Sequence, residues 1–321
     1  MPAQAGIQFL VLLLLACTRQ SAPSAEAALG TRESCAAYSG MPARFGDDPH
    51  AGMLQIAAGD FDLGSDRGYA EEGPPQRAHI DSFWIDRTEV TNAQFAAFVR
   101  ATGYVTEAEK QGGGAVFVAP RADESAEPGS WWQFAKGASW HFPEGKSNAA
   151  SRDQEPVVDV TYADALAYAH WLHRELPTEA QWEFAAKAGR SNEEADRSVR
   201  DAQGRPQANF WQGVFPISNA LEDGFALRAP VGCYPANPAG LHDMVGNVWE
   251  WTRDPYRERG AHPSIADPMP SRNASATRYV IKGGSYLCSL NYCARARASS
   301  RQGAEADLPQ SHVGFRTIAP G

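Results

Sequence analysis

Apolar side chains recur every three or four residues in one early segment, so that Phe95, Phe98 and Val99 would share one face of a helix. A threonine precedes this segment, and a glutamine stands three residues after that threonine, which is the pattern of a capping box. Two later segments also begin after a threonine, and a glycine or a proline follows each of the three. We therefore predict helices at 92–102, 162–176 and 179–188.

Strand-like patterns are sparse. Short pieces at 82–86 and 279–282 have the mixture of apolar and aromatic residues that is typical of strands. The residues after Asn209 show little periodicity of either kind, so we expect loops there whose order comes from something other than strand ladders. No change of composition, charge block or repeat divides the chain after residue 50, which favours one domain at 51–321.

The first 27 residues resemble a targeting segment. The apolar run at 7–16 is long enough for a signal peptide but too short for a membrane-spanning helix, which needs about 20 residues. The letters LLAC that end at Cys17 resemble a lipobox, which would put a lipid on Cys17 and anchor the protein to a membrane. Cleavage near Ala25 is the plainer alternative. We predict export to the periplasm in either case, with residues 28–50 as an N-terminal arm.

The composition excludes several classes of protein. Apolar residues make up 43% of the chain and charged residues 21%, a balance that excludes a disordered protein. The net charge of −9 argues against nucleic acid as a partner, because nucleic-acid binding needs a basic face. Five cysteines are too few for a disulfide scaffold, and their odd number leaves at least one without an intramolecular partner.

Two of these cysteines lie close together near the C-terminus. Cys288 and Cys293 are five residues apart, which puts them on opposite faces of a strand and about 140° apart on a helix. Their sulfurs can meet only if the chain turns between them. Such a pair suits a soft, low-coordinate ion such as Cu(I), although a structural disulfide is the common outcome in an exported protein. The nearby Arg295, Arg297 and Arg301 would favour the thiolate form.

The chain resembles the formylglycine-generating enzymes, the sulfatase-modifying oxidase family, through most of residues 52–316. Matching segments include FWIDRTEVTNAQFAAFV, LPTEAQWEFAAKAG, GLHDMVGNVWEWTRD and HVGFR. Each of these alone would indicate only a wider superfamily, which also holds non-haem iron sulfoxide synthases and members with no known catalysis. The specific part is the cysteine pair in KGGSYLCSLNYC, which matches the two copper-binding cysteines of the oxygen-dependent enzymes.

This resemblance implies a fold and an activity. The fold would be a compact, C-type-lectin-like α+β domain with little regular secondary structure. The activity would be oxidation by O2 of a cysteine in a Cys-x-Pro-x-Arg motif of an unfolded sulfatase, giving formylglycine, with Cu(I) held by Cys288 and Cys293. Ser285 and Arg301 match pocket positions, and Trp249 matches an aromatic residue that lines the site. A turn hydroxyl at Ser285 and a core position for Trp249 are the plainer alternatives.

The resemblance also implies two structural calcium sites, each combining side-chain and backbone oxygens, as calcium requires. The first would use the side chains of Asn209 and Asp223 and the carbonyls of Phe210 and Phe225. The second would use the side chains of Asp243 and Glu250 and the carbonyls of Gly246 and Val248. Without the resemblance, these segments are typical of acidic turns.

A competing hypothesis keeps the fold but not the catalysis. The chain would then be a non-catalytic exported binding protein or lipoprotein, with Cys288 and Cys293 in a structural disulfide. In both cases we expect a monomer, and Cys35 and Cys233 remain as a pair that could tie the N-terminal arm to the domain. The further disulfides of some animal members are absent, because their cysteine positions are occupied by Ala169, Ala186, Ala298 and Thr317.

Overall fold

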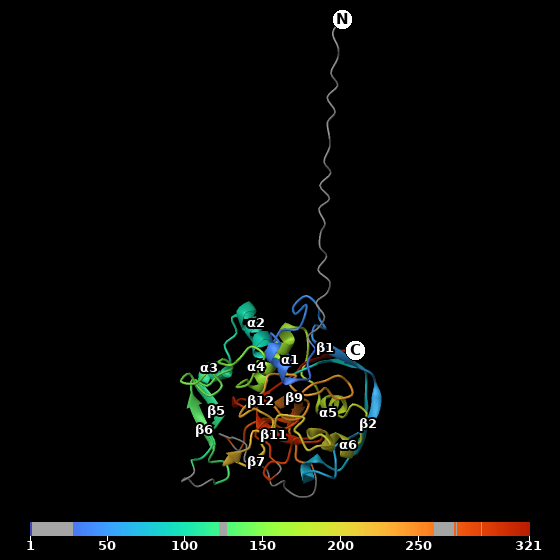
Figure 1. Cartoon of the computed structure of the whole chain (residues 1–321), viewed down its shortest axis with the longest axis vertical. Coiled ribbons are helices and arrows are strands. Elements are labelled where there is room, and N and C mark those ends of the chain that lie inside the picture. Colours follow the sequence, from blue (N-terminus) through green and yellow to red (C-terminus); the bar gives the residue numbers. More distant parts are fainter. Residues whose placement is uncertain (2–27, 122–126, 260–272, 274, 290) are drawn as a thin grey trace.

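A four-stranded sheet lies in the middle of the computed structural model (Figure 1), which describes residues 1, 28–121, 127–259, 273, 275–289 and 291–321. The predicted export segment, with Cys17, is outside the described part apart from its first residue. Among the described residues, no helix is both long enough and apolar enough to cross a membrane.

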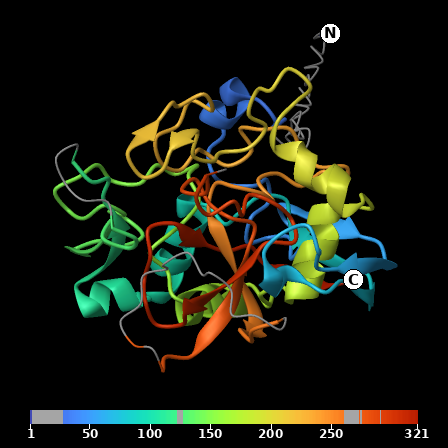
Figure 2. The ribbon, with the colours of Figure 1, turned by 90° about the horizontal axis from the view of Figure 1, so that it is seen from below.

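The central sheet has the order β11–β10–β9–β12. Its strands are β9 (Trp249–Pro255), β10 (Arg278–Lys282), β11 (Arg301–Glu305) and β12 (Val313–Gly314). β10 runs antiparallel to β9 and β11, and β12 runs parallel to β9. Figure 2 shows these orange and red strands between the green segments on one side and the yellow helices α5 and α6 on the other.

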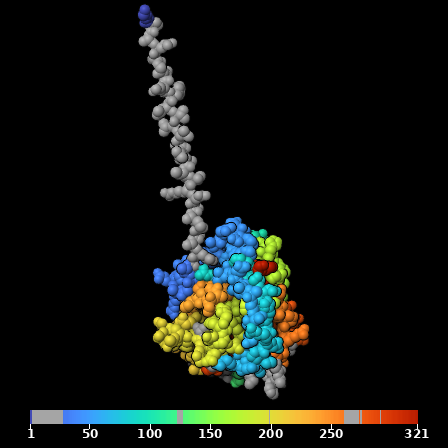
Figure 3. All heavy atoms as spheres, turned by 90° about the vertical axis from the view of Figure 1, so that its right-hand side faces the viewer, coloured from blue at the N-terminus to red at the C-terminus, as the bar shows by residue number. Residues whose placement is uncertain are grey.

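Smaller sheets surround the central one. β1 (Met53–Ile56), β4 (Phe83–Asp86) and β13 (Ile318–Pro320) form a three-stranded sheet that joins the two ends of the domain. Three ribbons complete the strands: β2 (Gly59–Leu63) with β3 (Gln76–Ile80), β5 (Gly113–Phe117) with β6 (Trp132–Lys136), and β7 (Gly213–Val214) with β8 (Ser218–Asn219). In Figure 3 the light-blue β2–β3 ribbon covers one face of the molecule beside the yellow segment of α5 and α6.

The helices are short and capped by side chains. They are α1 (Arg32–Ala37), α2 (Asn92–Thr102), α3 (Glu107–Gln111), α4 (Tyr162–Trp171), α5 (Glu179–Lys187) and α6 (Asn192–Asp196), with single turns at Ala70–Glu72 and Arg197–Val199. The capping box predicted for α2 is present, since Thr91 Oγ1 accepts from the Gln94 amide at 3.2 Å and Gln94 Oε1 accepts from the Thr91 amide at 2.9 Å. α5 is capped in the same way, and both helices confirm the prediction to within one residue.

The prediction for α4 was too long, because the helix ends at Trp171 rather than at residue 176. His173 adopts a positive φ of 56°, and the Arg174 amide turns back to the Ala169 carbonyl at 2.9 Å. This turn buries the Arg174 guanidinium 2.8 Å from Asp86 Oδ1. The helix therefore ends early because the chain turns to pair the buried Arg174 with Asp86, although the sequence pattern favours a longer helix.

The expectation of loops without strand ladders after residue 209 was wrong, because the central sheet lies there. All five residues of β11 are buried, as are the first four of β9, and β11 (RQGAE) shows no alternation of polar and apolar positions. Charged residues such as Glu250 and Arg301 lie inside the protein, where ion pairs compensate them. A strand that is buried on both faces gives no period-2 signal.

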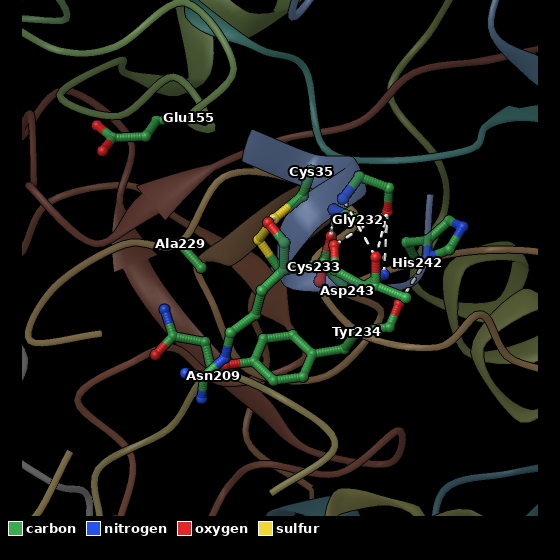
Figure 4. The surroundings of a disulfide bond; sticks show 12 residues. Cys35, Glu155, Asn209, Ala229, Gly232, Cys233, Tyr234, His242 and Asp243 are labelled. Carbon is green, nitrogen blue, oxygen red and sulfur yellow. Dashed lines mark hydrogen bonds between the residues drawn. A yellow bond between two sulfur atoms is a disulfide. The ribbon is translucent and has the colours of Figure 1, made fainter. Parts of the chain in front are cut away.

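The predicted pairing of Cys35 with Cys233 is confirmed by a disulfide (Figure 4). The bond joins α1 to a loop 198 residues away in the sequence. The Gly30 amide also donates to the Gly232 carbonyl at 2.7 Å. The N-terminal arm is thus held against the domain by covalent and backbone contacts.

Candidate functional site

The two C-terminal cysteines meet at a tight turn. Their Sγ atoms lie 3.1 Å apart, which is too far for a disulfide bond of about 2.05 Å. The turn between them closes through hydrogen bonds in both directions between the backbones of Ser289 and Tyr292, at 2.9 and 3.2 Å. Cys293 has a positive φ of 50°, and it is half-buried, whereas Cys288 is buried. The turn that the sequence required is therefore present.

An aromatic cluster supports this turn from one side. The Trp211 amide donates to the Cys288 carbonyl at 2.9 Å, and Tyr292 stacks on Phe215 with ring centres 4.8 Å apart. Trp131 packs edge-on against both Phe215 and Tyr292. Interlocked aromatic rings of this kind hold a turn rigidly, since each ring has few free torsions. The turn that sets the spacing of the two sulfurs is thus held in place by contacts with residues outside it, namely Trp131, Trp211 and Phe215.

Ser285 lies directly beside Cys288. Its backbone amide donates to the Cys288 sulfur at 3.4 Å, and the Cys288 amide returns a bond to the Ser285 carbonyl at 2.9 Å. A hydrogen bond donated to sulfur favours the thiolate over the thiol. Trp249 is almost fully buried and belongs to the same core cluster as the two cysteines. The structure therefore brings Ser285 next to Cys288 and places Trp249 in the core cluster that includes Cys288.

A cavity of about 160 Å³ opens over the cysteines. Its wall includes both cysteines, Phe210 and the predicted arginines 295 and 297. Both guanidinium groups pair with carboxylates. Arg295 lies 2.6 Å from Glu71, and Arg297 forms an ion pair with Glu72. This acidic pair, which precedes a glycine, was not singled out in the sequence. It neutralises much of the positive charge that the arginines bring.

Arg301 lies elsewhere in the protein. Its Nε donates to Glu179 Oε1 at 2.8 Å, and its Nη1 donates to the Arg257 carbonyl at 3.0 Å. The guanidinium also covers the ring of Tyr256 at 5.0 Å. The lining of the cysteine cavity does not include Arg301. Its predicted role in orienting substrate stays a prediction, while its observed role is to pair β11 with the start of α5.

The residues of the first predicted calcium site are close together. The Asp223 carboxylate accepts from the backbone amides of Phe210 at 3.1 Å and of Phe225 at 3.0 Å. Gln212, which sequence reasoning missed, donates to the same carboxylate at 2.6 Å. The Asn209 amide group donates to the Leu227 carbonyl at 2.9 Å. Burial raises the pKa of Asp223 above its ordinary value. The donor set has the mixed oxygen chemistry of a calcium site, and in this structure the Asp223 carboxylate and the Phe210 carbonyl accept hydrogen bonds from N–H groups instead.

The second predicted calcium site holds more buried negative charge than the sequence indicated. Glu250 forms a bidentate ion pair with Arg316, with both contacts at 2.7 Å. Asp243 accepts from the Gly232 amide at 2.5 Å (Figure 4). Glu89 is fully buried, and its Oε2 has no hydrogen-bond partner within the described residues. Three carboxyls therefore share one guanidinium.

The carboxyl groups of this second site repel one another. Burial, and then the charges of Asp243 and Glu250, raise the pKa of Glu89 well above its ordinary value. Burial likewise raises the pKa of Asp243 to about 6. A cation near Glu89 and Asp243 would remove this cost, so the residues fit calcium. Glu89 was missed because it lies between a strand and a helix, in a segment of the sequence that carries no metal-ligand motif.

Within the ranges that the structure describes, no group of three or more His, Cys, Asp or Glu side chains is placed to hold a metal ion by itself. A metal bound by the two cysteines would therefore need a further ligand from outside, and calcium at the two predicted sites would need amide and carbonyl oxygens as well as carboxylates.

Comparison with known proteins gives consistent results. The family model of the sulfatase-modifying factor enzyme 1-like domain matches residues 39–320. The formylglycine-generating enzyme of Mycobacterium tuberculosis is 40% identical over an alignment of 290 residues, and the match covers 83% of this chain and 97% of that protein. A mouse protein named inactive Cα-formylglycine-generating enzyme 2 is 37% identical over 276 residues, covering 82% and 84% of the two chains.

The solved structure of PvdO from Pseudomonas aeruginosa has the same fold, with a TM-score of 0.55 and 24% identity over 84% of this chain and 94% of that one. This likeness confirms the predicted α+β domain. The family model matches most of this chain, and the alignment with the Mycobacterium tuberculosis enzyme covers almost all of that enzyme. The chain therefore belongs to the sulfatase-modifying factor enzyme family, the family of the formylglycine-generating enzymes.

Proposed function

We propose that this protein oxidises a cysteine in a Cys-x-Pro-x-Arg segment of an unfolded sulfatase to formylglycine, using O2 and Cu(I) held by Cys288 and Cys293. The observation that carries the proposal is the pair of sulfurs 3.1 Å apart, not joined by a disulfide, at the wall of a cavity. The identity of about 40% to relatives named formylglycine-generating enzymes supports it. Family membership alone does not decide activity, because one relative is named inactive.

The two cysteines have different surroundings that suit a shared soft ion. Cys288 is buried and receives a hydrogen bond from the Ser285 amide, which favours its thiolate. Cys293 is half-buried, so a substrate thiol can approach the pair from its side. Bound Cu(I) would supply the one-electron chemistry with O2 that side chains lack.

The small size of the cavity favours an unfolded substrate. Its volume of about 160 Å³ is below the range of drug-sized sites, which begin near 300 Å³, and suits one side chain. A cysteine within a folded protein could not enter a cavity of this size to reach Cys288, which is buried. An extended segment could, which is why the proposed substrate is an unfolded polypeptide.

The proposed reaction has a simple electron balance. The thiol-bearing carbon of the substrate cysteine becomes an aldehyde and its sulfur leaves as hydrogen sulfide, while O2 is reduced to water and water supplies the aldehyde oxygen. This balance needs two electrons and two protons from outside, which a thiol reductant supplies as it becomes a disulfide. The chain's own residues bind, orient and shield the reacting thiol.

We further propose that calcium at both predicted sites stabilises the fold. Support comes from the oxygen donors gathered around Asp223 and from the surplus of buried carboxyl groups around Asp243 and Glu89. The cation would have a structural role, because, apart from Phe210, these residues are separate from the wall of the cysteine cavity.

We also infer that the reaction takes place outside the cytoplasm, on the basis of the segment at residues 1–27. Mass spectrometry of the mature protein tests this. A free N-terminus after residue 25 or a lipid on Cys17 would support export, and an intact Met1 would refute it.

The activity test uses copper-loaded protein, a peptide with the Cys-x-Pro-x-Arg motif, a thiol reductant and O2. We expect an aldehyde that reacts with a hydrazide probe. The C288S and C293S variants should each abolish the product, and so should exclusion of oxygen. If the wild type forms no aldehyde and the two cysteines are found as a disulfide, the non-catalytic alternative is correct.

A further inference from the structure

A buried histidine lies on the far side of Ser285 from the cysteine pair. His312 is 3% exposed, and its Nδ1 lies 3.3 Å from the Ser285 hydroxyl oxygen. Its Nε2 lies 3.3 Å from Gln310 Oε1, and its ring packs against Trp132 with ring centres 4.6 Å apart. His312 begins the matching segment HVGFR, but neither the predicted site residues nor the proposed reaction includes its side chain. Each of its ring nitrogens nevertheless has a defined partner.

These partners determine where the imidazole proton lies. Gln310 Oε1 can only accept, so Nε2 of His312 must carry the hydrogen and Nδ1 must present a lone pair. The Ser285 hydroxyl then donates to Nδ1, while its oxygen accepts from the Leu287 amide at 3.3 Å. Ser285 therefore has its proton committed to His312, and only a lone pair remains for a ligand.

His312 is poorly suited to accept a proton. Burial lowers its pKa to about 3, and the side chains that contact it, Ser285, Gln310 and Trp132, are all uncharged. A neutral imidazole at every working pH is a fixed hydrogen-bond acceptor rather than a general base. Any effect of His312 on the proposed reaction must therefore act through its hydrogen bond with Ser285.

The serine in turn is part of the cysteine turn. Ser285 donates its backbone amide to the Cys288 sulfur and accepts from the Cys288 amide. His312 itself is tied to the central sheet, because its carbonyl accepts from the Trp249 amide at 2.9 Å. A continuous path of hydrogen bonds thus leads from the sheet through His312 and Ser285 to the sulfur.

We propose that His312 is a positioning residue that holds the Ser285 hydroxyl in one orientation and so fixes the turn that presents Cys288. This inference rests on the proposed function for its catalytic consequence, but the geometry can be tested without turnover. Ser285 would face a bound ligand as an acceptor only, which favours a substrate thiol or amide that donates over an oxygen species that needs a donor.

The first test is NMR of Cu(I)-loaded protein labelled with ¹⁵N-histidine, which is suitable because Cu(I) is diamagnetic. The H312N variant identifies the signals of His312 by their loss. We expect the neutral Nε2–H form from about pH 5 to 8, and a shift of the Nδ1 signal in S285A. An Nδ1–H form, or a histidine that titrates in this range, would overturn the proposal.

The second test is a double-mutant cycle on turnover of the motif peptide. H312A and S285A should each lower kcat roughly five- to tenfold, with KM nearly unchanged, as the loss of one hydrogen bond predicts. The double variant should be no slower than S285A alone, and H312N, which keeps an acceptor oxygen, should recover most of the rate. Additive losses would refute the path through Ser285.

The two proposals fail in different ways. A wild-type protein that makes no formylglycine would refute the proposed function, and the NMR test would still decide the geometry of His312. An active wild type whose H312A variant keeps full kcat would refute the positioning role alone. Thermal melting of each variant separates loss of rate from loss of fold.

Discussion

Lys282 and Glu183 form an ion pair with no solvent exposure, in which the Nζ atom lies 2.8 Å from Oε2. Glu183 belongs to α5, and Lys282 is the last residue of β10, directly before the glycines that lead into the cysteine turn. A side chain at Gly283 would meet the ring of Trp182, also from α5, at 3.0 Å. The helix thus fixes the strand end from which the cysteine turn begins.

Replacing Glu183 with Gln should destabilise the protein by about 3–5 kcal/mol, because it leaves the Lys282 ammonium buried without its main partner. Urea unfolding measures the loss. E193Q is a suitable control, since Glu193 makes an exposed ion pair with Arg197 and such pairs contribute little. Equal stabilities of E183Q and E193Q would contradict the assigned role.

The same pair predicts a pH dependence. Burial alone would raise the pKa of Glu183, but the ammonium groups of Lys282 and Lys187 lower it below the ordinary value of 4.5. A lowered pKa stabilises the fold above the unfolded-state pKa, and this stabilisation is lost as the pH falls through the folded-state value. The difference in unfolding free energy between wild type and E183Q should therefore shrink below about pH 4. A difference in unfolding free energy that stays constant down to pH 3 would contradict the lowered pKa of Glu183.

Parts of the fold with local signals could be predicted from the sequence. Thr91 and Gln94 define the start of α2 within four residues of chain, and the spacing of Cys288 and Cys293 requires a turn. β11 could not be predicted, because its burial on both faces removes the alternation of polar and apolar residues.

The charged residues that surround the cysteines could not be predicted from the sequence for a different reason. Glu72 pairs with Arg297 across 225 residues, and Glu89 meets Asn247 across 158. No periodicity or motif connects residues so far apart. Only the three-dimensional structure shows that Arg295 and Arg297 near the cysteines are paired with acidic residues. It also shows that Glu89 adds a third carboxyl group beside Asp243 and Glu250, at the predicted second calcium site.

Removal of calcium should lower the melting temperature of the protein. Binding at about 100 times Kd would stabilise the native state by about 2.7 kcal/mol per site, so a strong chelator should lower Tm by roughly 5 °C or more in a protein of this size. The D243N and D223N variants should each show a smaller chelator effect than the wild type. An unchanged Tm after full chelation would refute both structural sites.

The calcium-free and calcium-loaded proteins should respond to pH in opposite directions. Because burial raises the pKa of Asp243 to about 6, the chelated native state holds a proton that the unfolded chain releases, so its stability should rise as the pH falls from about 7 to 5. In the loaded protein the proton competes with calcium, and stability should fall over the same range. Urea unfolding at both pH values measures each trend. Parallel trends would contradict the assignment of Asp243 as a ligand.

The cysteine pair should oxidise in metal-free protein exposed to air. Its sulfurs need to approach by only about 1 Å, from 3.1 Å to the disulfide length of about 2.05 Å. Alkylation followed by mass spectrometry should find two free thiols in reduced protein and none after oxidation, while Cu(I) should protect both. A pair that stays reduced in air without copper would indicate that the turn holds the sulfurs apart.

Loss of the structural disulfide should weaken the fold without affecting the active pair. The bond between Cys35 and Cys233 closes a loop of about 200 residues, and removing a native disulfide typically costs about 2–5 kcal/mol. The double variant C35S/C233S should therefore unfold at lower urea, while Cys288 and Cys293 keep their alkylation pattern and the motif peptide is still converted. The arm also contacts the domain through the Gly30 amide and the Gly232 carbonyl, next to Asp243. If the variant also loses its chelator-sensitive stabilisation, the arm shapes the second calcium site as well as bracing the domain; unchanged stability would show that the arm contributes neither.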